Sequence, residues 1–334
     1  MTRRTLGKVG PTVSSIGLGC MGMSDLYGPA DELESIATIH AALDAGITLF
    51  DTGDYYGMGH NELLLRDALR GRARERAVIS VKFGAMRDAK GAWLGVDARP
   101  AAVRNFIAYS LRRLDTEYID IYRPGRLDPK VPIEETVGAI ADLIKEGLVR
   151  FIGLSEVGAD TLERAHRVHP ISDLQIEYSL MSRGIESAIL PAARALGIGI
   201  TAYGVLSRGL LSGAWTQDRS LPRNDLRQYL PRFRSENLER NLAIVEKVRE
   251  LASGKGATVA QVAIAWVLAR GQDIVPLVGA RRRERLAEAL GALKVSLSAE
   301  DIAKLEAAVP ADAVAGMRYD EHQMQILDSE RSSR

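Results

Sequence analysis

A carboxylate, two adjacent tyrosines and a lysine, between positions 51 and 82, could supply a general acid for a carbonyl oxygen. Asp51 ends an apolar run, Tyr55 and Tyr56 follow it, and Lys82 lies within the next apolar run. A cation about 4 Å from a phenol contributes roughly 4 kcal/mol at an effective dielectric of about 20, which would bring the phenol's pKa from near 10 toward neutrality. A carboxylate paired with the lysine would hold it charged and in place. Such a trio could act as a general acid.

Two other interpretations of Lys82 remain open. Only nine of the 44 basic residues are lysines, and this one lies in a β-like run. Its side chain could extend from the strand end to solvent. It could also form a Schiff base, as in a barrel aldolase, but that needs a lysine of low pKa, and Asp51 should keep Lys82 charged.

The elements that position these residues form an alternating pattern. Short β-rich apolar runs are separated by longer stretches with helical periodicity, which is typical of βα units around a parallel sheet. Eight such units predict a single (β/α)₈ barrel, an α/β fold whose functional residues lie at the carboxyl ends of the strands. The expected strands are 15–19, 47–51, 77–83, 118–122, 149–154, 173–178, 198–203 and 274–278.

Helical periodicity and capping residues give the connecting elements. A β-hairpin is expected before the first strand, and the 211–240 segment, which follows strand seven, lacks a clear period. The core of this single domain of residues 1–334 should run from about 3 to 310, with a tail from about 311 that wraps the surface. The expected helices are about 31–45, 60–70, 100–114, 134–146, 159–168, 186–196, 241–253, 258–270, 282–291 and 298–308.

Composition bounds the possible functions. The 334 residues carry 44 basic and 43 acidic side chains, a net charge of +1, which argues against a global nucleic-acid or membrane-surface footprint. The one cysteine, Cys20, cannot form an internal disulfide, and no apolar run approaches the 18 or so residues of a membrane span. We expect a cytoplasmic protein without a metal site.

Taken together, the motifs resemble those of the aldo-keto reductases, in the branch that includes pyridoxal reductases and the potassium-channel β subunits. The resemblance spans about residues 3–320 and rests on IGLGCMG, DTGDYYG, VKFG, GLSEV, QIEYS and YGVLSRGLLSG. It implies that NADPH lies across the barrel mouth and gives a hydride to an aldehyde or ketone, which a tyrosine protonates. The matching catalytic residues are Asp51, Tyr56 and Lys82, with Tyr55 as the alternative acid.

The chain departs from the family at the fourth catalytic position. The family histidine at the end of strand four corresponds to Gly125. Loss of one hydrogen-bond donor to the carbonyl typically costs about 10²–10³ in rate. Alternatively, Arg123 or Arg126 polarises the carbonyl, unless these arginines pair with Asp128 for structural reasons.

The resemblance also assigns a cofactor site. Ser155, Glu156 and Gln175 would meet the nicotinamide carboxamide, and Tyr203 would stack on its ring. A GxGxxG match at 17–22 starts within the expected strand 15–19 and is separated from the next expected helix, which begins near 31, so a Rossmann site is disfavoured. The remaining cofactor-binding positions are Gly19, Cys20 and Met21 after strand one, and the pyrophosphate turn with Gly204, Leu206, Arg208 and Gly209.

The segment after strand eight favours NADP(H) over NAD(H). Gly279 precedes an arginine-rich run that enters a helix, and arginines at a helix N-terminus suit a phosphate group. The resemblance places the adenosine 2′-phosphate beside Arg281 and Arg285, and the adenine beside Glu288. Ala289 replaces a family asparagine at the adenine site.

Two functions fit these observations. The first is an NADPH-dependent reductase of a small-molecule aldehyde or ketone, with Tyr56 as acid tuned by Lys82 and Asp51. The second is a cofactor-binding regulatory or redox-sensing subunit with little turnover. Retention of Asp51, Tyr56 and Lys82 favours the first function, whereas Gly125 and Ala289 keep the second open. The sequence identifies neither the carbonyl substrate nor the oligomeric state.

Overall fold

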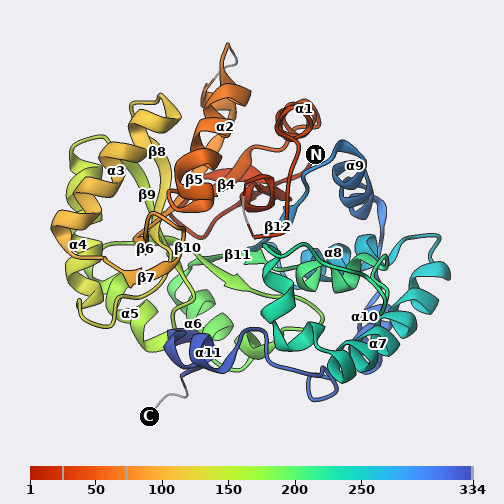
Figure 1. Ribbon diagram of the computed structural model, residues 1–334. Coiled ribbons are helices and arrows are strands. Elements are labelled where there is room, and N and C mark those ends of the chain that lie inside the picture. Colours follow the sequence, from red (N-terminus) through yellow and green to blue (C-terminus); the bar gives the residue numbers. More distant parts are fainter. Residues whose placement is uncertain (25, 72–73, 332–334) are drawn as a thin grey trace.

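Eight parallel strands close into a barrel at the centre of the molecule (Figure 1). The structure is a computed structural model that describes residues 1–24, 26–71 and 74–331. All eight predicted strands are confirmed, with ends shifted by a few residues, and the predicted (β/α)₈ fold is correct. The barrel strands are β3 (Gly17–Gly19), β4 (Leu49–Gly53), β5 (Val78–Phe83), β8 (Ile119–Pro124), β9 (Val149–Ser155), β10 (Ile171–Glu177), β11 (Gly199–Tyr203) and β12 (Ile274–Gly279).

Helices surround the barrel, and their ends follow the capping residues in the sequence. The Asp31 side chain accepts a hydrogen bond from the backbone N–H of Glu34 at the start of the first helix, and Thr258 forms a capping box with Gln261. The helices are α1 (Glu32–Asp44), α2 (His60–Leu69), α3 (Pro100–Leu114), α4 (Ile133–Lys145), α5 (Ala159–Val168), α6 (Ile189–Leu196), α7 (Ser235–Ser253), α8 (Val259–Ala269), α9 (Arg283–Gly291), α10 (Ala299–Ala308) and α11 (Glu321–Ile326).

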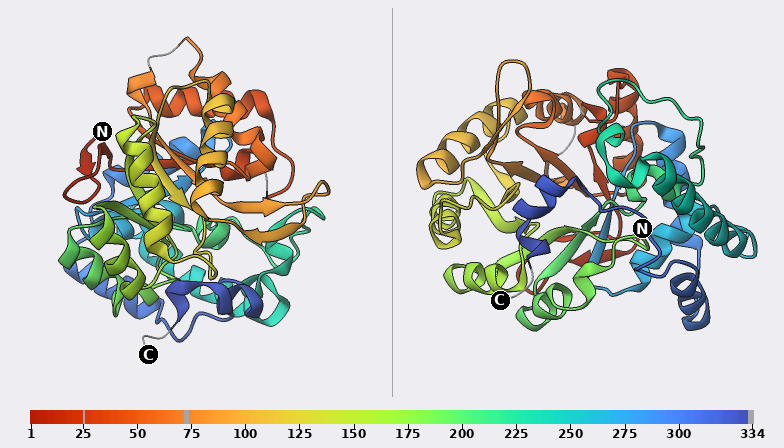
Figure 2. Two further views of the ribbon diagram at one scale, coloured as in Figure 1. Left: turned by 90° about the vertical axis from the view of Figure 1, so that its left-hand side faces the viewer. Right: turned by 60° about the horizontal axis from the view of Figure 1, so that its bottom comes forward.

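Two β-hairpins lie outside the barrel sheet. The predicted hairpin pairs β1 (Arg3–Thr5) with β2 (Thr12–Ser14), and its buried Leu6 and Val13 join a cluster with residues at the amino ends of the barrel strands. Sequence reasoning missed the second hairpin, β6 (Ala85–Arg87) with β7 (Trp93–Val96), which directly follows β5. The left view of Figure 2 shows the two hairpins on opposite sides of the molecule.

The barrel interior is polar where the strands approach their carboxyl ends. Side chains alternate along a strand, so the apolar Phe50, Val81 and Leu174 pack toward the helices while their neighbours face the barrel axis. The strand register aligns Asp51 with Ser80 and Lys82 with Arg123. The parallel sheet thus brings residues distant in sequence into two polar layers.

The segments after β11 and after α10 differ from expectation. The 211–240 segment contains short 3₁₀ turns, and α7 begins at Ser235 rather than near residue 241. The tail was expected to wrap the surface, which is wrong for part of it: Arg318 and Tyr319 are buried at 8% and 6% exposure. The reason is a buried carboxylate, Glu156, which needs a cationic partner. Within the described ranges, no helix is long and apolar enough to cross a membrane.

Candidate active site

Asp51, Lys82 and Tyr56 meet at the carboxyl end of β4 and β5, as the sequence predicts. The ammonium of Lys82 pairs with Oδ1 of Asp51, and both side chains are at most 6% exposed. The other Asp51 oxygen accepts hydrogen bonds from Ser80 Oγ at 2.9 Å and Gln175 Nε2 at 2.7 Å. Lys82 Nζ lies 5.3 Å from the centre of the Tyr56 ring. The carboxylate therefore orients the lysine beneath the phenol.

The electrostatics of this trio differ from the expectation. Burial raises the pKa of the Tyr56 phenol, and the nearby Tyr55 and Asp51 raise it further. Burial also lowers the pKa of Lys82 more strongly than the Asp51 carboxylate raises it. The predicted drop of the phenol pKa toward neutrality is therefore wrong. Because Lys82 is buried and paired with the Asp51 carboxylate, the pair offers the phenol little net positive charge. Tyr56 therefore stays protonated, as a proton donor must.

Tyr55 packs against Tyr56 at the barrel mouth. Its ring makes edge contacts with Tyr56, at 4.9 Å between ring centres, and with Trp93 of β7, at 5.6 Å. The two phenols are close enough to influence each other's pKa. Both candidate acids thus lie in one site.

The two candidate arginines occupy different depths. Arg123 is fully buried, and its guanidinium forms two hydrogen bonds with Asp173 (3.0 and 3.2 Å) and one with Ser80 (3.1 Å). Asp128 is therefore not its partner, and the guanidinium supports the layer under Lys82. Arg126 lies at the mouth instead: it donates to the Gly125 carbonyl at 2.7 Å and to the Tyr319 hydroxyl at 3.3 Å.

The residues expected to meet the carboxamide are adjacent, but their hydrogen bonding differs. Ser155 and Gln175 are paired in register between β9 and β10. The Ser155 hydroxyl is buried and has no hydrogen-bond partner among the described residues, so it can bind a ligand. Gln175 instead reaches across the barrel to Asp51.

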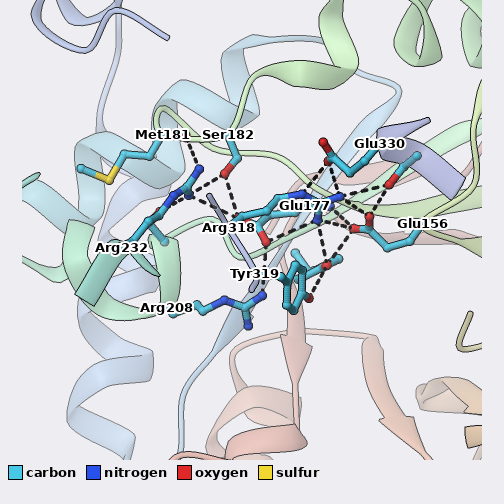
Figure 3. A network of polar contacts seen from close by, with 12 residues as sticks. Glu156, Glu177, Met181, Ser182, Arg208, Arg232, Arg318, Tyr319 and Glu330 are labelled. Atoms are coloured by element: carbon cyan, nitrogen blue, oxygen red, sulfur yellow. Dashed lines mark hydrogen bonds and ion pairs between the residues drawn. The ribbon is translucent and has the colours of Figure 1, made fainter. Parts of the chain in front are cut away.

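Glu156 is held by the C-terminal tail (Figure 3). Arg318 binds both of its carboxylate oxygens, and Tyr203 Oη and Ser329 Oγ each donate to it at 2.7 Å. Burial disfavours the charged carboxylate, but Arg318 outweighs burial and lowers the pKa of Glu156 to about 2. One sequence signal could have revealed this contact, namely an acidic residue at a strand end without a basic residue beside it in the sequence.

Tyr319 extends the tail contact over the barrel mouth. Its hydroxyl lies 2.9 Å from that of Tyr203, and the Arg208 guanidinium lies 4.6 Å from its ring centre. Burial raises the pKa of the Tyr319 phenol, but Arg208 and Arg126 together lower it below its usual value. Figure 3 shows Arg208, Tyr319 and Arg318 side by side, so the tail covers the expected nicotinamide end of the cofactor site.

The predicted pyrophosphate turn is compact and strained. It follows β11 as a 3₁₀ turn, Ser207–Ser212, that begins one residue after Leu206. Gly204 and Gly209 have φ of +65° and +105°, and Arg208 also has positive φ, at +56°. The backbone N–H groups of Ser207 and Gly209 donate to the carbonyls of Gly204 and Leu206, at 2.7 and 2.8 Å, so these donors close the turn itself.

Two arginine-rich segments that are far apart in sequence meet beside this turn. Arg281 donates to the carbonyls of Tyr27 and Pro29, both at 3.1 Å. Burial lowers the pKa of Arg281, and so do Arg227, Arg282 and Arg219. Arg285 is 47% exposed and pairs with Glu288 at 2.9 Å. Arg227 is paired with Asp225, which also raises the pKa of Arg281, so the surplus of arginines over carboxylates here leaves a local positive charge.

The remaining predicted residues lie at the ends of neighbouring strands. Gly19 is aligned with both Asp51 and Gly279 across the sheet. Cys20 is buried, its backbone N–H donates to the Asp51 carbonyl at 2.9 Å, and burial raises the pKa of its thiol. Met21 begins a 3₁₀ turn and is partly exposed.

Comparison with known proteins agrees with this geometry. Residues 15–310 match the model of the aldo/keto reductase family. The chain is 45% identical over 316 residues to a probable aldo-keto reductase 1 of Glycine max, covering 94% of this chain and 90% of the relative.

Solved structures are similar over nearly the whole chain. A glycerol dehydrogenase from Gluconobacter oxydans is 32% identical with a TM-score of 0.83, covering 92% of this chain and 96% of that one. An aldo-keto reductase from Bacillus halodurans, in its holo form, is 27% identical with a TM-score of 0.76, covering 97% and 99%. Barrel, strand-end residues and relatives agree: the chain belongs to the aldo/keto reductase family of oxidoreductases.

Proposed function

We propose that this protein is an NADPH-dependent reductase of aldehydes or ketones. The observation that carries the proposal is the buried Asp51–Lys82 pair beneath the Tyr56 phenol, at the end of the barrel where this fold places its chemistry. Tyr56 is the proton donor to the carbonyl oxygen. Lys82 and Asp51 position it, and Ser80, Gln175 and Arg123 hold that pair in place.

The residues at the mouth fit a nicotinamide dinucleotide in part. The unpartnered Ser155 hydroxyl would bind the carboxamide, since a buried donor without a partner otherwise costs free energy. Glu156, whose oxygens are already bound by the tail, would act by holding Tyr203 rather than by direct contact. When bound, the reduced nicotinamide supplies the hydride.

The arginine cluster supports NADP(H) over NAD(H). Arg219, Arg227, Arg281 and Arg282 influence one another electrostatically, and Arg285 acts on Arg219. A 2′-phosphate placed among them would relieve this repulsion and gain charge-assisted hydrogen bonds. We expect NADPH to bind much more tightly than NADH. Equal dissociation constants for the two, measured by fluorescence titration, would contradict the assignment.

The activity is tested by monitoring NADPH oxidation against a panel of ring, aliphatic and aromatic aldehydes and of ketones. Tyr56→Phe removes only the hydroxyl and should abolish turnover without changing NADPH affinity. Tyr109→Phe, at a tyrosine that is 57% exposed, is the matched control and should leave turnover unchanged. Turnover that survives in Tyr56→Phe would refute its role as the acid.

The alternative function is a cofactor-binding regulatory or redox-sensing subunit with little turnover. It is favoured by the tail residues Arg318 and Tyr319, which cover the mouth, and by the absence of a side chain at Gly125. NADPH binding with negligible oxidation across the whole panel would select this function.

A further inference from the structure

The space beside Gly125 is occupied by a side chain from another strand end. A Cβ atom built on Gly125 would lie 2.9 Å from Oη of Tyr55 and 3.2 Å from its Cε1. The first separation is shorter than real Cβ contacts and the second is tighter than most of them, so a side chain at 125 would displace the Tyr55 hydroxyl. The position of Tyr55 therefore requires glycine at 125.

Tyr55 is fixed in this position by contacts on three sides. Its ring packs edge-on against Tyr56 and against Trp93 of the β6–β7 hairpin. The Tyr55 and Tyr56 phenols influence each other's pKa, and Arg126 contributes positive charge near both. Burial raises the pKa of Tyr55, so its hydroxyl stays protonated.

The reaction proposed above calls for two hydrogen bonds at one atom. Negative charge develops on the carbonyl oxygen during reduction, and that oxygen can accept two hydrogen bonds. Tyr56 supplies one, and the residue position that supplies the other in the family has no side chain here. The Tyr55 hydroxyl occupies that place, and its ring is in edge contact with that of Tyr56.

We propose that Tyr55 is a second catalytic residue, whose hydroxyl, placed by Gly125, donates a hydrogen bond to the carbonyl oxygen while Tyr56 donates the proton. The inference rests on the proposed reductase function and deepens it. It assigns Arg126 a supporting role, since its guanidinium adds positive potential at the two hydroxyls. Arg123, buried beneath Lys82, does not reach this oxygen.

The first test removes the Tyr55 hydroxyl alone. Tyr55→Phe keeps the ring contacts with Tyr56 and Trp93, and we expect kcat to fall about 10²–10³-fold, as for loss of one oxyanion donor, with KM and the NADPH dissociation constant little changed. Tyr109→Phe is the surface control, and thermal unfolding checks that Tyr55→Phe is folded. A kcat within twofold of the wild type would overturn the inference.

The second test restores the donor from the other strand. Tyr55→Ala empties the space next to residue 125, and the double variant Tyr55→Ala, Gly125→His places an imidazole there. We expect the double variant to recover at least tenfold of the kcat that Tyr55→Ala loses. A pure packing role for Tyr55 predicts no recovery, and that result would overturn the inference even if Tyr55→Phe fails to fold.

Different results would refute the proposed reductase function and the proposed role of Tyr55. If the wild type oxidises no NADPH with any carbonyl compound, or if Tyr56→Phe is fully active, the proposed function is wrong. If Tyr56→Phe is inactive while Tyr55→Phe turns over like the wild type, the function stands and the role of Tyr55 is wrong.

Discussion

The buried pair of Glu156 and Arg318 should make the C-terminal tail essential for stability. Replacing Arg318 with Met keeps most of the side-chain volume but leaves Glu156, which is 1% exposed, without its cation. Breaking a buried pair by removing one partner typically costs about 3–5 kcal/mol. The linkage estimate is similar: a pKa of about 2 in the folded state, against about 4.3 when unfolded, corresponds to about 3 kcal/mol.

The chain supplies a matched control for this substitution. Arg104 and Glu146 form a pair with the same two-point geometry, at 2.7 and 3.2 Å, but their side chains are 48% and 44% exposed. Arg104→Met should cost at most about 1 kcal/mol, because solvent screens exposed pairs.

Urea denaturation at pH 7, followed by circular dichroism, measures both free energies of unfolding. We expect Arg318→Met to lose about 3 kcal/mol more than Arg104→Met. If the two variants had equal free energies of unfolding, the buried Arg318–Glu156 pair would contribute no more stability than an exposed pair, and the prediction would be refuted.

Four further predictions follow from individual contacts. Because the pKa of Glu156 is lower in the folded than in the unfolded state, its charge stabilises the fold fully above the unfolded pKa of about 4.3, and this stabilisation is lost as the pH falls toward 2. In urea titrations, the difference in free energy of unfolding between wild type and Glu156→Gln should therefore shrink by about 3 kcal/mol between pH 5 and pH 2. Gln175→Leu removes the 2.7 Å hydrogen bond to Asp51 and should lower kcat about tenfold in steady-state assays, while an unchanged kcat would show that Gln175 does not position the pair. Arg285→Ala should weaken NADPH binding but not NADH binding, narrowing the ratio of their dissociation constants, and a parallel loss for both cofactors would argue against a 2′-phosphate contact. Leu6→Ala opens the apolar cluster at the closed end of the barrel and should cost about 2–5 kcal/mol in urea denaturation, with the NADPH dissociation constant as the unaffected control.

The barrel was predictable because its signals are local. Strand and helix periodicities repeat along the chain, and a parallel sheet necessarily collects the carboxyl ends of its strands at one rim. Asp51 and Lys82 could therefore be placed together from sequence alone. The β6–β7 hairpin was missed because its strands are three and four residues long and partly exposed, so they carry no burial pattern.

The site features that the sequence did not predict all depend on contacts between residues far apart in the chain. For Arg123 the sequence left two interpretations, polarising the carbonyl or pairing with Asp128, but alternation points it at Asp173 on a strand two positions around the barrel. The pKa of Tyr56 depends on how dry the site is, which no local pattern reports. Arg318 looks like a surface residue until the fold brings it to Glu156.

The tail contact also affects the order in which the chain can complete its site during synthesis. Glu156 and Arg318 are separated by 162 residues. At roughly 5–20 residues per second, Arg318 is added roughly 8–30 s after Glu156. During that interval Glu156 has no Arg318 to pair with, and the Tyr203 hydroxyl lacks its contact with the Tyr319 hydroxyl. A ribosome-bound chain can therefore complete the barrel, whose last strand ends at Gly279, before it can complete the mouth, which needs Arg318.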